Sequence, residues 1–238
     1  MKINEAIILA GGLGTRLRSA VPELPKCMAP VAGRPFIHHV IEYLKGQGIQ
    51  KFLFSLGYKH QDIESYLDAA FPDLQKRYVV EKEPLGTGGA IKLACLQATE
   101  KTVLITNGDT LFRVDLAKLA AFHFMSGSVC TLSLKPMADF ERYGVVELNT
   151  DYRVGSFREK QYYEKGLING GLYLLNVVPF LEEPFPPKFS FEKDYLEQYY
   201  TTRRIFGVVD DAYFIDIGIP VDYQRAQTEL AGGGLGNG

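Results

Sequence analysis

Short apolar runs alternate with amphipathic stretches along the first half of the chain. Residues 6–9 form an unbroken apolar run that is typical of a buried strand, and the apolar spacing over 36–44 predicts one face of a helix ending near Gly46. Further strands are expected over 51–56, 77–80 and 102–106, with helices over about 61–71 and after the glycines at 86–89. This alternation predicts a mostly parallel sheet with helices on both faces and right-handed crossovers.

The second half has more strands and fewer helices. Strands are expected over 129–134, 144–148, 154–157, 167–175 and 212–215, and helices over 189–200 and 221–230. We therefore predict one α/β domain over 1–231, with a single Rossmann-like mixed, mostly parallel sheet flanked by helices and a smaller β-rich extension that forms the other wall of a cleft. The glycine-rich tail 232–238 is expected to be disordered or left over from cloning.

Composition narrows the possible functions. A chain of 238 residues can bury a full core, and its net charge of -2 without a basic block gives no reason to expect nucleic acid as a partner. Three widely separated cysteines, and no leader before the first strand, favour a reducing cytoplasm. No apolar run approaches the roughly 20 residues that span a bilayer. The four histidines lack metal-ligand spacing, so zinc is not expected.

A glycine-rich loop follows the first apolar run. Gly11, Gly12 and Gly14 can adopt backbone angles that other residues avoid and leave room for a ligand. Amides in such a turn can point at an anion, and Arg16 and Lys26 add positive charge beside them. The loop is therefore interpreted as a phosphate-binding element, with a tight turn that binds nothing as the alternative.

Two familiar glycine loops do not fit. A P-loop requires Gly-x-x-x-x-Gly-Lys followed by Ser or Thr, and the chain has no such run. The dinucleotide fingerprint Gly-x-Gly-x-x-Gly has Leu17 in place of its last glycine, and residues 53–58 lack the acidic residue that should end the second strand. A dinucleotide-dependent oxidoreductase is accordingly disfavoured.

Two aspartates end predicted strands. Asp109 and Asp216 would be costly to bury unpaired, and carboxylates beside a phosphate loop suit Mg²⁺, which prefers a few hard oxygen ligands. Asp109 could instead cap the segment near Asp115 or close a turn. Asp210 and Asp211 precede the apolar strand and are interpreted as a solvated turn.

Two further charged pairs are candidates. Glu81 and Glu83 end the third strand, and a carboxylate can accept from both N1 and N2 of guanine, whereas uracil and thymine offer only N3. The alternative is that at least one of these two glutamates is an ordinary surface residue. Glu159 and Lys160 end a short strand that could aim both into the cleft, or form an ordinary charged edge.

Together these motifs resemble the sugar-phosphate nucleotidyltransferase family over nearly the whole chain. The segments that carry the resemblance are 9–17 with Pro25-Lys26, 83–90, 107–109, 143–147, 157–160, 169–171 and 214–218. Within the family, segments 17–31, 165–171 and 189–194 look most like the D-glycero-α-D-manno-heptose 1-phosphate guanylyltransferases. Two residues depart from the family pattern: Cys27 stands where many relatives have proline, and Gly89 where alanine is common. The chain has no left-handed β-helix repeats of the kind that some relatives carry, so a second activity is not expected.

The resemblance implies transfer of GMP from GTP to a sugar 1-phosphate, with Mg²⁺ as cofactor and pyrophosphate as the second product. Residues up to about 135 would bind the nucleotide, and residues from about 136 to 231 the sugar. By this resemblance the catalytic residues are Arg16, Lys26 and Lys160, and the metal ligands are Asp109 and Asp216. The nucleotide would contact Leu9, Gly11, Gly12, Gly14, Thr15, Glu81, Glu83, Gly86, Thr87 and Gly88, and the sugar would contact Gly144, Glu159, Asn169 and Gly170.

Several alternatives stay open at this stage. The acceptor could be mannose 1-phosphate in place of the heptose, and the donor could be UTP or dTTP. A noncatalytic nucleotide-sugar sensor is a different class, but the charged residues that such a protein would lose are present. A retaining glycosyltransferase is disfavoured because Asn107-Gly108-Asp109-Thr110 lacks paired aspartates. The sequence does not determine the oligomeric state, and a homo-oligomer is one of the states that it allows. If the heptose interpretation holds, the resemblance implies a product used in surface polysaccharide or glycoprotein assembly.

Overall fold

The computed structural model describes residues 2–12, 17 and 21–231. Its central sheet has a parallel half ordered β5 (Gln75–Val80), β4 (Lys51–Leu56), β1 (Glu5–Ala10) and β6 (Thr102–Asn107). Helices α1 (Phe36–Gly46), α2 (His60–Ala70) and α3 (Gly86–Cys95) connect these strands in turn. The first half of the chain therefore has the alternating architecture that its hydrophobic pattern predicts.

The alternation of side chains along β1 explains the two helical layers. Ala6 and Ile8 belong to one buried cluster, whereas Ile7 belongs to the other. The first cluster includes residues of α1, α2, α4 (Leu116–Ser126) and α7 (Pro220–Ala231), and the second includes residues of α3, α5 (Val177–Leu181) and the π-helix η2 (Phe191–Leu196). The sheet is thus covered on both faces.

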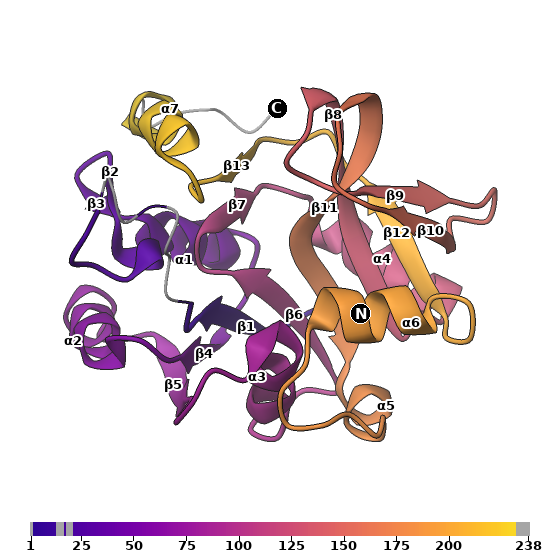
Figure 1. Cartoon of the computed structure of the whole chain (residues 1–238). Coiled ribbons are helices and arrows are strands. Elements are labelled where there is room, and N and C mark those ends of the chain that lie inside the picture. Colours follow the sequence, from indigo (N-terminus) through magenta and orange to yellow (C-terminus); the bar gives the residue numbers. More distant parts are fainter. Residues whose placement is uncertain (1, 13–16, 18–20, 232–238) are drawn as a thin grey trace.

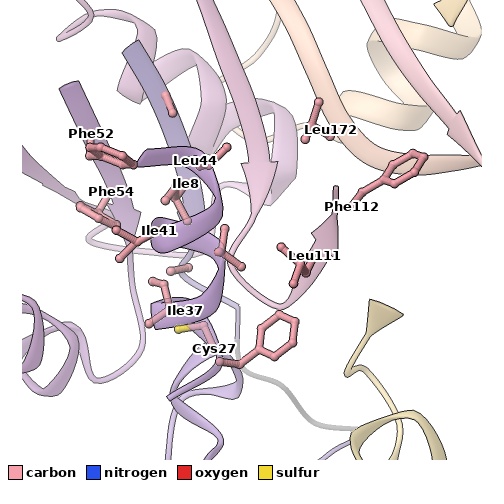
Figure 2. Packing of buried hydrophobic residues seen from close by; sticks show 14 of the residues in the cluster. Ile8, Cys27, Ile37, Ile41, Leu44, Phe52, Phe54, Leu111, Phe112 and Leu172 are labelled. Atoms are coloured by element: carbon pink, nitrogen blue, oxygen red, sulfur yellow. The ribbon is translucent and has the colours of Figure 1, made fainter. Parts of the chain in front are cut away.

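Helix α1 illustrates why the pattern was sufficient here. Its apolar residues Ile37, Ile41 and Leu44 recur every three or four positions and are fully buried, and they belong to one cluster with Ile8 and Phe54 (Figure 2). The helix runs from Phe36 to Gly46, where the pattern predicted it.

Strand β11 (Tyr163–Asn176) joins the two halves of the sheet. It pairs antiparallel with β6 on one side and with β8 (Cys130–Phe140) on the other, and β12 (Ile205–Val209) then pairs parallel with β8. Strands β9 (Val145–Leu148) and β10 (Val154–Arg158) form an antiparallel ribbon beside β11 (Figure 1). This is the β-rich extension that was predicted, on a sheet whose mixed α/β class is confirmed.

Small elements complete the fold near the end of β6. Strand β7 (Thr110–Phe112) pairs with β13 (Phe214–Asp216), which brings a segment from the middle of the chain together with one from its last quarter. The 3-10 turn η1 (Lys26–Met28) leads into the ribbon of β2 (Pro30–Val31) and β3 (Arg34–Pro35). The short helix α6 (Glu197–Tyr199) follows η2.

Several predicted elements needed correction. Helix α4 was not predicted, because its sequence is apolar on most sides and this hides the helical period. The N-cap of α4 is Asp115 and not Asp109: Asp115 Oδ1 accepts from Ala117 N and Lys118 N, each at 3.0 Å. Strands β7 and β12 were also missed. Helix α3 begins at Gly86, not after the glycines, and the helix expected over 189–200 begins as a π-helix at Phe191.

Candidate functional site

A cleft of about 850 Å³ lies at the carboxyl ends of β1, β4 and β6. Strand β1 has β4, the next strand of this half along the chain, on one side and β6 on the other. The strand order therefore changes direction at β1, and connections that diverge at such a point leave a crevice at the carboxyl ends of the strands. Gly108 N donates to Leu9 O at 2.8 Å and ties the ends of β1 and β6 together. The lining includes Leu9, Ala10, Gly11, Gly12, Lys26, Cys27, Ser55, Gly57, Tyr58, Glu81, Lys82, Glu83, Pro84, Gly86, Thr87, Ala90, Asn107, Asp109, Thr110, Asp216 and Gly218.

The first two loop glycines line this cleft for different reasons. A Cβ on Gly11 would lie 2.8 Å from Glu81 Oε1 and 3.3 Å from Gly57 N, so only glycine fits without displacing the glutamate. A Cβ on Gly12 would meet none of the described residues within 4 Å. The loop residues Gly14, Thr15 and Arg16, which the sequence also assigned to the nucleotide site, lie outside the described residues.

The Lys26 ammonium lies between two carboxylates. It forms an ion pair with Asp109, which follows β6, and its Nζ is 3.4 Å from Asp216 Oδ1 at the end of β13. The side chains of Lys26, Asp109 and Asp216 are 14%, 27% and 24% exposed. Burial by itself would lower the pKa of Lys26, but the two carboxylates outweigh burial and raise the pKa above its ordinary value. Lys26 therefore stays charged.

The same arrangement tests whether a divalent cation fits. The carboxylates of Asp109 and Asp216 both lie against the Lys26 ammonium. Carboxylate oxygens are the ligands that a hard divalent cation prefers. Within the described residues, no group of three or more His, Cys, Asp or Glu side chains is placed to hold a metal. Asp109 and Asp216 offer two hard oxygen donors, which fit an ion such as Mg²⁺ that can take its remaining ligands from phosphate and water.

Tyr143 is a neighbour of the metal-site candidate that the sequence did not assign to the site. Its hydroxyl donates to Asp216 Oδ2 at 3.3 Å, and Gly218 N donates to Asp216 Oδ1 at 2.8 Å. Arg142 in turn donates to Tyr143 Oη at 2.9 Å. These contacts hold the Asp216 carboxylate in one orientation, and no local sequence signal identifies them because Tyr143 and Asp216 are far apart in the chain.

Glu81 and Glu83 both line the cleft, but in different environments. Glu81 is half-buried, and its Oε2 accepts from Leu85 N at 2.9 Å. Burial raises the pKa of Glu81, and the bond from Leu85 N offsets part of this rise. Glu83 is exposed. The half-buried Glu81 is therefore the more strongly positioned of the two carboxylates.

The glycines at the start of α3 serve packing as well as the cleft. Gly86, with φ +73°, and Thr87 line the cleft, whereas Gly88 does not. A Cβ on Gly88 would lie 2.3 Å from the ring of Phe189. Thr87 Oγ1 donates to Glu192 Oε2 at 2.6 Å and accepts from Phe191 N at 2.9 Å, so its hydroxyl binds the π-helix.

The residues assigned to the sugar and its phosphate lie beyond the lining of this cleft. Gly144 precedes β9, where a Cβ would lie 2.5 Å from Arg158 O. Glu159 and Lys160 follow β10 and are exposed. On β11, Gly170 packs against the Phe112 ring, and Asn169 Nδ2 donates to Tyr173 Oη at 2.9 Å. These residues belong to the extension, next to the β6 end of the sheet.

Ser55 and Cys27 line the cleft but were not assigned to the site from sequence. Ser55, near the end of β4, is 1% exposed, and its hydroxyl has no hydrogen-bond partner among the described residues. A serine inside the apolar strand Lys51–Leu56 is the signal that could have identified it. Burial, followed by the charge of Asp109, raises the pKa of Cys27 to about 12, so its thiol is held in the protonated form.

Comparisons with known proteins identify the family of this chain. The family described as nucleotidyl transferase matches residues 5–232. The D-glycero-alpha-D-manno-heptose 1-phosphate guanylyltransferase of Aneurinibacillus thermoaerophilus is 52% identical over 95% of this chain and 98% of its own length. The protein of that name from Campylobacter jejuni subsp. jejuni serotype O:2 is 44% identical over 92% and 96%.

A solved structure is similar over the same range. HddC from Yersinia pseudotuberculosis, solved in complex with GMP-PN, superposes with a TM-score of 0.87 and 38% identity, covering 96% of this chain and 100% of HddC.

In the described part of the chain, none of the helices has the length and apolar character to cross a membrane.

Proposed function

This chain belongs to the nucleotidyl transferase family, and we propose that it transfers GMP from GTP to D-glycero-α-D-manno-heptose 1-phosphate, releasing pyrophosphate. The arrangement of Lys26, Asp109 and Asp216 at the glycine-lined end of β1 is the observation that carries the reaction class. The identity of the acceptor rests on the relatives of 52% and 44% identity, both of which bear the heptose name.

The chemistry requires positioning more than acid-base catalysis. A phosphate oxygen of the sugar 1-phosphate attacks the α-phosphorus of GTP, a new P–O bond forms, and the bond to the β-phosphate oxygen breaks as pyrophosphate leaves. The attacking oxygen is already anionic, so no side chain has to remove a proton. The barrier comes from bringing two polyanions together and aligning them in line, which cationic groups and a fixed geometry lower.

Lys26 is the described residue best placed to supply this charge. Its raised pKa keeps it cationic, and it lines the same cleft as Gly11 and Gly12, which suits contact with the triphosphate. Asp109 and Asp216 would hold Mg²⁺, which when bound neutralises phosphate charge. Arg16 is proposed as a second cation on the leaving pyrophosphate, and Lys160 as the cation on the acceptor phosphate.

Glu81 supports guanine as the base. Its half-buried carboxylate lines the cleft beside Gly11, and an ionised carboxylate can accept from both N1–H and N2–H of guanine. Residues up to about 135 would form the nucleotide side of the enzyme, and the extension from about 136 to 231 the sugar side. Asn169, Gly170, Gly144 and Glu159 are the proposed sugar contacts.

A substrate matrix tests this proposal. Purified enzyme is given GTP, UTP, dTTP, ATP or CTP with heptose 1-phosphate or mannose 1-phosphate, and pyrophosphate release is measured. We expect the highest kcat/KM with GTP and the heptose. A preference for mannose 1-phosphate would overturn the acceptor, and a preference for UTP or dTTP would overturn the base.

The role of Glu81 is tested with matched variants. Glu81→Gln should raise the KM for GTP by about tenfold or more, because a charged acceptor for guanine is lost. Glu83→Gln removes the same charge from the exposed neighbour and should change this KM by less than about twofold. Equal effects of the two substitutions would contradict the assignment of guanine binding to Glu81.

A further inference from the structure

The hydroxyl of Ser55 is buried and unpaired near the end of β4. Ser55 is 1% exposed, and its Oγ has no hydrogen-bond partner among the described residues. A buried hydroxyl without a partner costs free energy, because it has given up its bonds to water without replacing them. Since Ser55 also lines the cleft, a ligand bound there can supply the partner.

The alternation of side chains along β4 shows to which face Ser55 points. Phe54 and Leu56, its neighbours in the chain, both belong to the buried cluster that includes residues of α1. Successive side chains of a strand point to opposite faces, so Ser55 points to the face that α3 covers (Figure 1). Gly86 and Ala90 of α3 also line the cleft. Ser55 therefore faces the part of the cleft between the sheet and the start of α3.

Glu81 lies on the same face of the sheet as Ser55. Ser55 is paired with Val79 of β5, and Glu81 follows two residues later, so these side chains point to one face. The bond from Glu81 N to Leu56 O, at 2.8 Å, continues the pairing of the two segments to this point. The Glu81 carboxylate reaches across the end of β4, since its Oε1 would lie 2.8 Å from a Cβ on Gly11. One bound base can therefore contact both Ser55 and Glu81.

Guanine has an acceptor next to the edge that suits Glu81. A carboxylate can accept from N1–H and N2–H, and O6 is bonded to the ring carbon beside N1. The other acceptor beside this edge, N3, lies on the ribose side of the ring, whereas O6 lies away from the ribose. Ser55 is the most buried polar residue of the described cleft lining, which suits the end of the base remote from the ribose. Its hydroxyl can donate to O6.

We propose that Ser55 is a second residue that binds the guanine base: its hydroxyl donates to O6 while Glu81 accepts from N1–H and N2–H. The two side chains then match all three polar groups of this edge of guanine. The inference rests on the proposed function, because it takes the nucleotide to be GTP and Glu81 to contact its base.

Calorimetry with GTP and 6-thio-GTP tests the contact. In 6-thio-GTP a sulfur atom, which is a weak acceptor, replaces O6, while N1–H and N2–H are kept. Wild type should bind 6-thio-GTP about fivefold to tenfold more weakly than GTP, as for the loss of one neutral hydrogen bond. Ser55→Ala should bind GTP more weakly by about the same factor, and should bind the two nucleotides equally.

Ser133→Ala is the matched control. Ser133 of β8 is also 1% exposed with an unpaired hydroxyl, but it is outside the described cleft lining. Its substitution should leave the Kd for GTP within about twofold of wild type. Ser55→Cys keeps the side-chain volume of Ser55 but has only a weak donor, so it should weaken GTP binding like Ser55→Ala.

Stability without nucleotide separates a ligand contact from a structural role. Neither Ser55→Ala nor Ser133→Ala removes a hydrogen bond from the free enzyme, so neither should lower its unfolding midpoint in urea. A lower midpoint in Ser55→Ala would show that its hydroxyl has a structural partner and would overturn the inference. An unchanged Kd for GTP in Ser55→Ala, or a penalty for 6-thio-GTP as large as in wild type, would also overturn it.

These measurements distinguish this inference from the proposed function. A preference of wild type for mannose 1-phosphate would overturn the proposed acceptor, while the Kd values for GTP would still test Ser55. Loss of GTP affinity in Glu81→Gln but not in Ser55→Ala would support the proposed base and overturn this inference. Tighter binding of UTP or dTTP than of GTP by wild type would overturn both.

Discussion

Lys26 and Asp109 form an ion pair at the carboxyl end of the sheet, although they lie on different segments of the chain. Asp216 adds a second carboxylate 3.4 Å from the same ammonium nitrogen. The single charge of the lysine thus offsets half of the charge of two aspartates that are the proposed ligands of a divalent ion. We therefore expect that binding of a divalent cation to the two aspartates frees the Lys26 ammonium to contact phosphate.

Removal of the lysine should expose this competition. In Lys26→Met the two carboxylates lose their cationic partner, so calorimetry without nucleotide should show Mn²⁺ or Mg²⁺ binding several-fold more tightly than in wild type. Turnover should nevertheless fall by about a hundredfold or more, because a phosphate-binding cation is lost. Weaker metal binding in Lys26→Met would contradict the shared site.

Removal of a carboxylate should have a different effect. Asp109→Asn should lower kcat by about a hundredfold or more and weaken metal binding, while circular dichroism stays that of wild type. The control is Asp211→Asn, since the Asp211 side chain is 83% exposed and pairs with Lys135 outside the cleft lining. Near-normal turnover in Asp109→Asn would reject its role as a metal ligand.

Two glycines that line the cleft should respond differently to alanine. A Cβ on Gly57 would lie 2.9 Å from Gly11 O and 3.2 Å from Gly11 Cα, which are backbone atoms that cannot move aside cheaply. Gly57→Ala should therefore lower the free energy of unfolding by about 1–3 kcal/mol. Gly12→Ala meets no atom of the described residues within 4 Å and should leave the unfolding midpoint in urea unchanged, but it should weaken GTP binding if the triphosphate occupies that space.

His123 makes stability depend on pH. It lies on the buried face of α4 and is 1% exposed; its Nε2–H donates to Asn176 Oδ1 and its Nδ1 accepts from Thr131. Burial lowers the pKa of His123 below its ordinary value of 6.5, despite the opposing bond with Asn176. The unfolded chain then binds this proton more readily than the folded one, so stability present above pH 6.5 is lost as pH falls towards the folded-state pKa.

Urea unfolding at pH 7.5 and 5.5 measures this effect. The contribution of one histidine has a slope of at most about 1.4 kcal/mol per pH unit in that window. His123→Gln keeps a donor and an acceptor but cannot titrate, so its stability should fall less than that of wild type between the two pH values. An identical fall in the two proteins would show that other groups carry the pH dependence.

Local pattern was sufficient where one period dominated. Strand β4 begins and ends at the predicted residues 51 and 56, because it is a short apolar run whose side chains are buried in the clusters on both faces of the sheet. Helix α1 follows the predicted apolar face, because it buries one side against the sheet. Helix α4 escaped prediction because it is apolar on most sides, and β7 because three residues are too few to show a period. The sugar-side assignments stay predictions, since Asn169 and Lys160 lie beyond the cleft lining.

The sequence by itself determined the alternation of strands and helices and the glycine loop with its nearby cations, because these depend on neighbours within a few residues. It also singled out Asp109 and Asp216, since each ends an apolar run. Only the tertiary structure decided that these two carboxylates share Lys26, and that Thr87 of the cleft lining binds Glu192 of the π-helix. Such contacts join residues far apart in the chain, and they depend on strand order and helix packing, which no local period encodes.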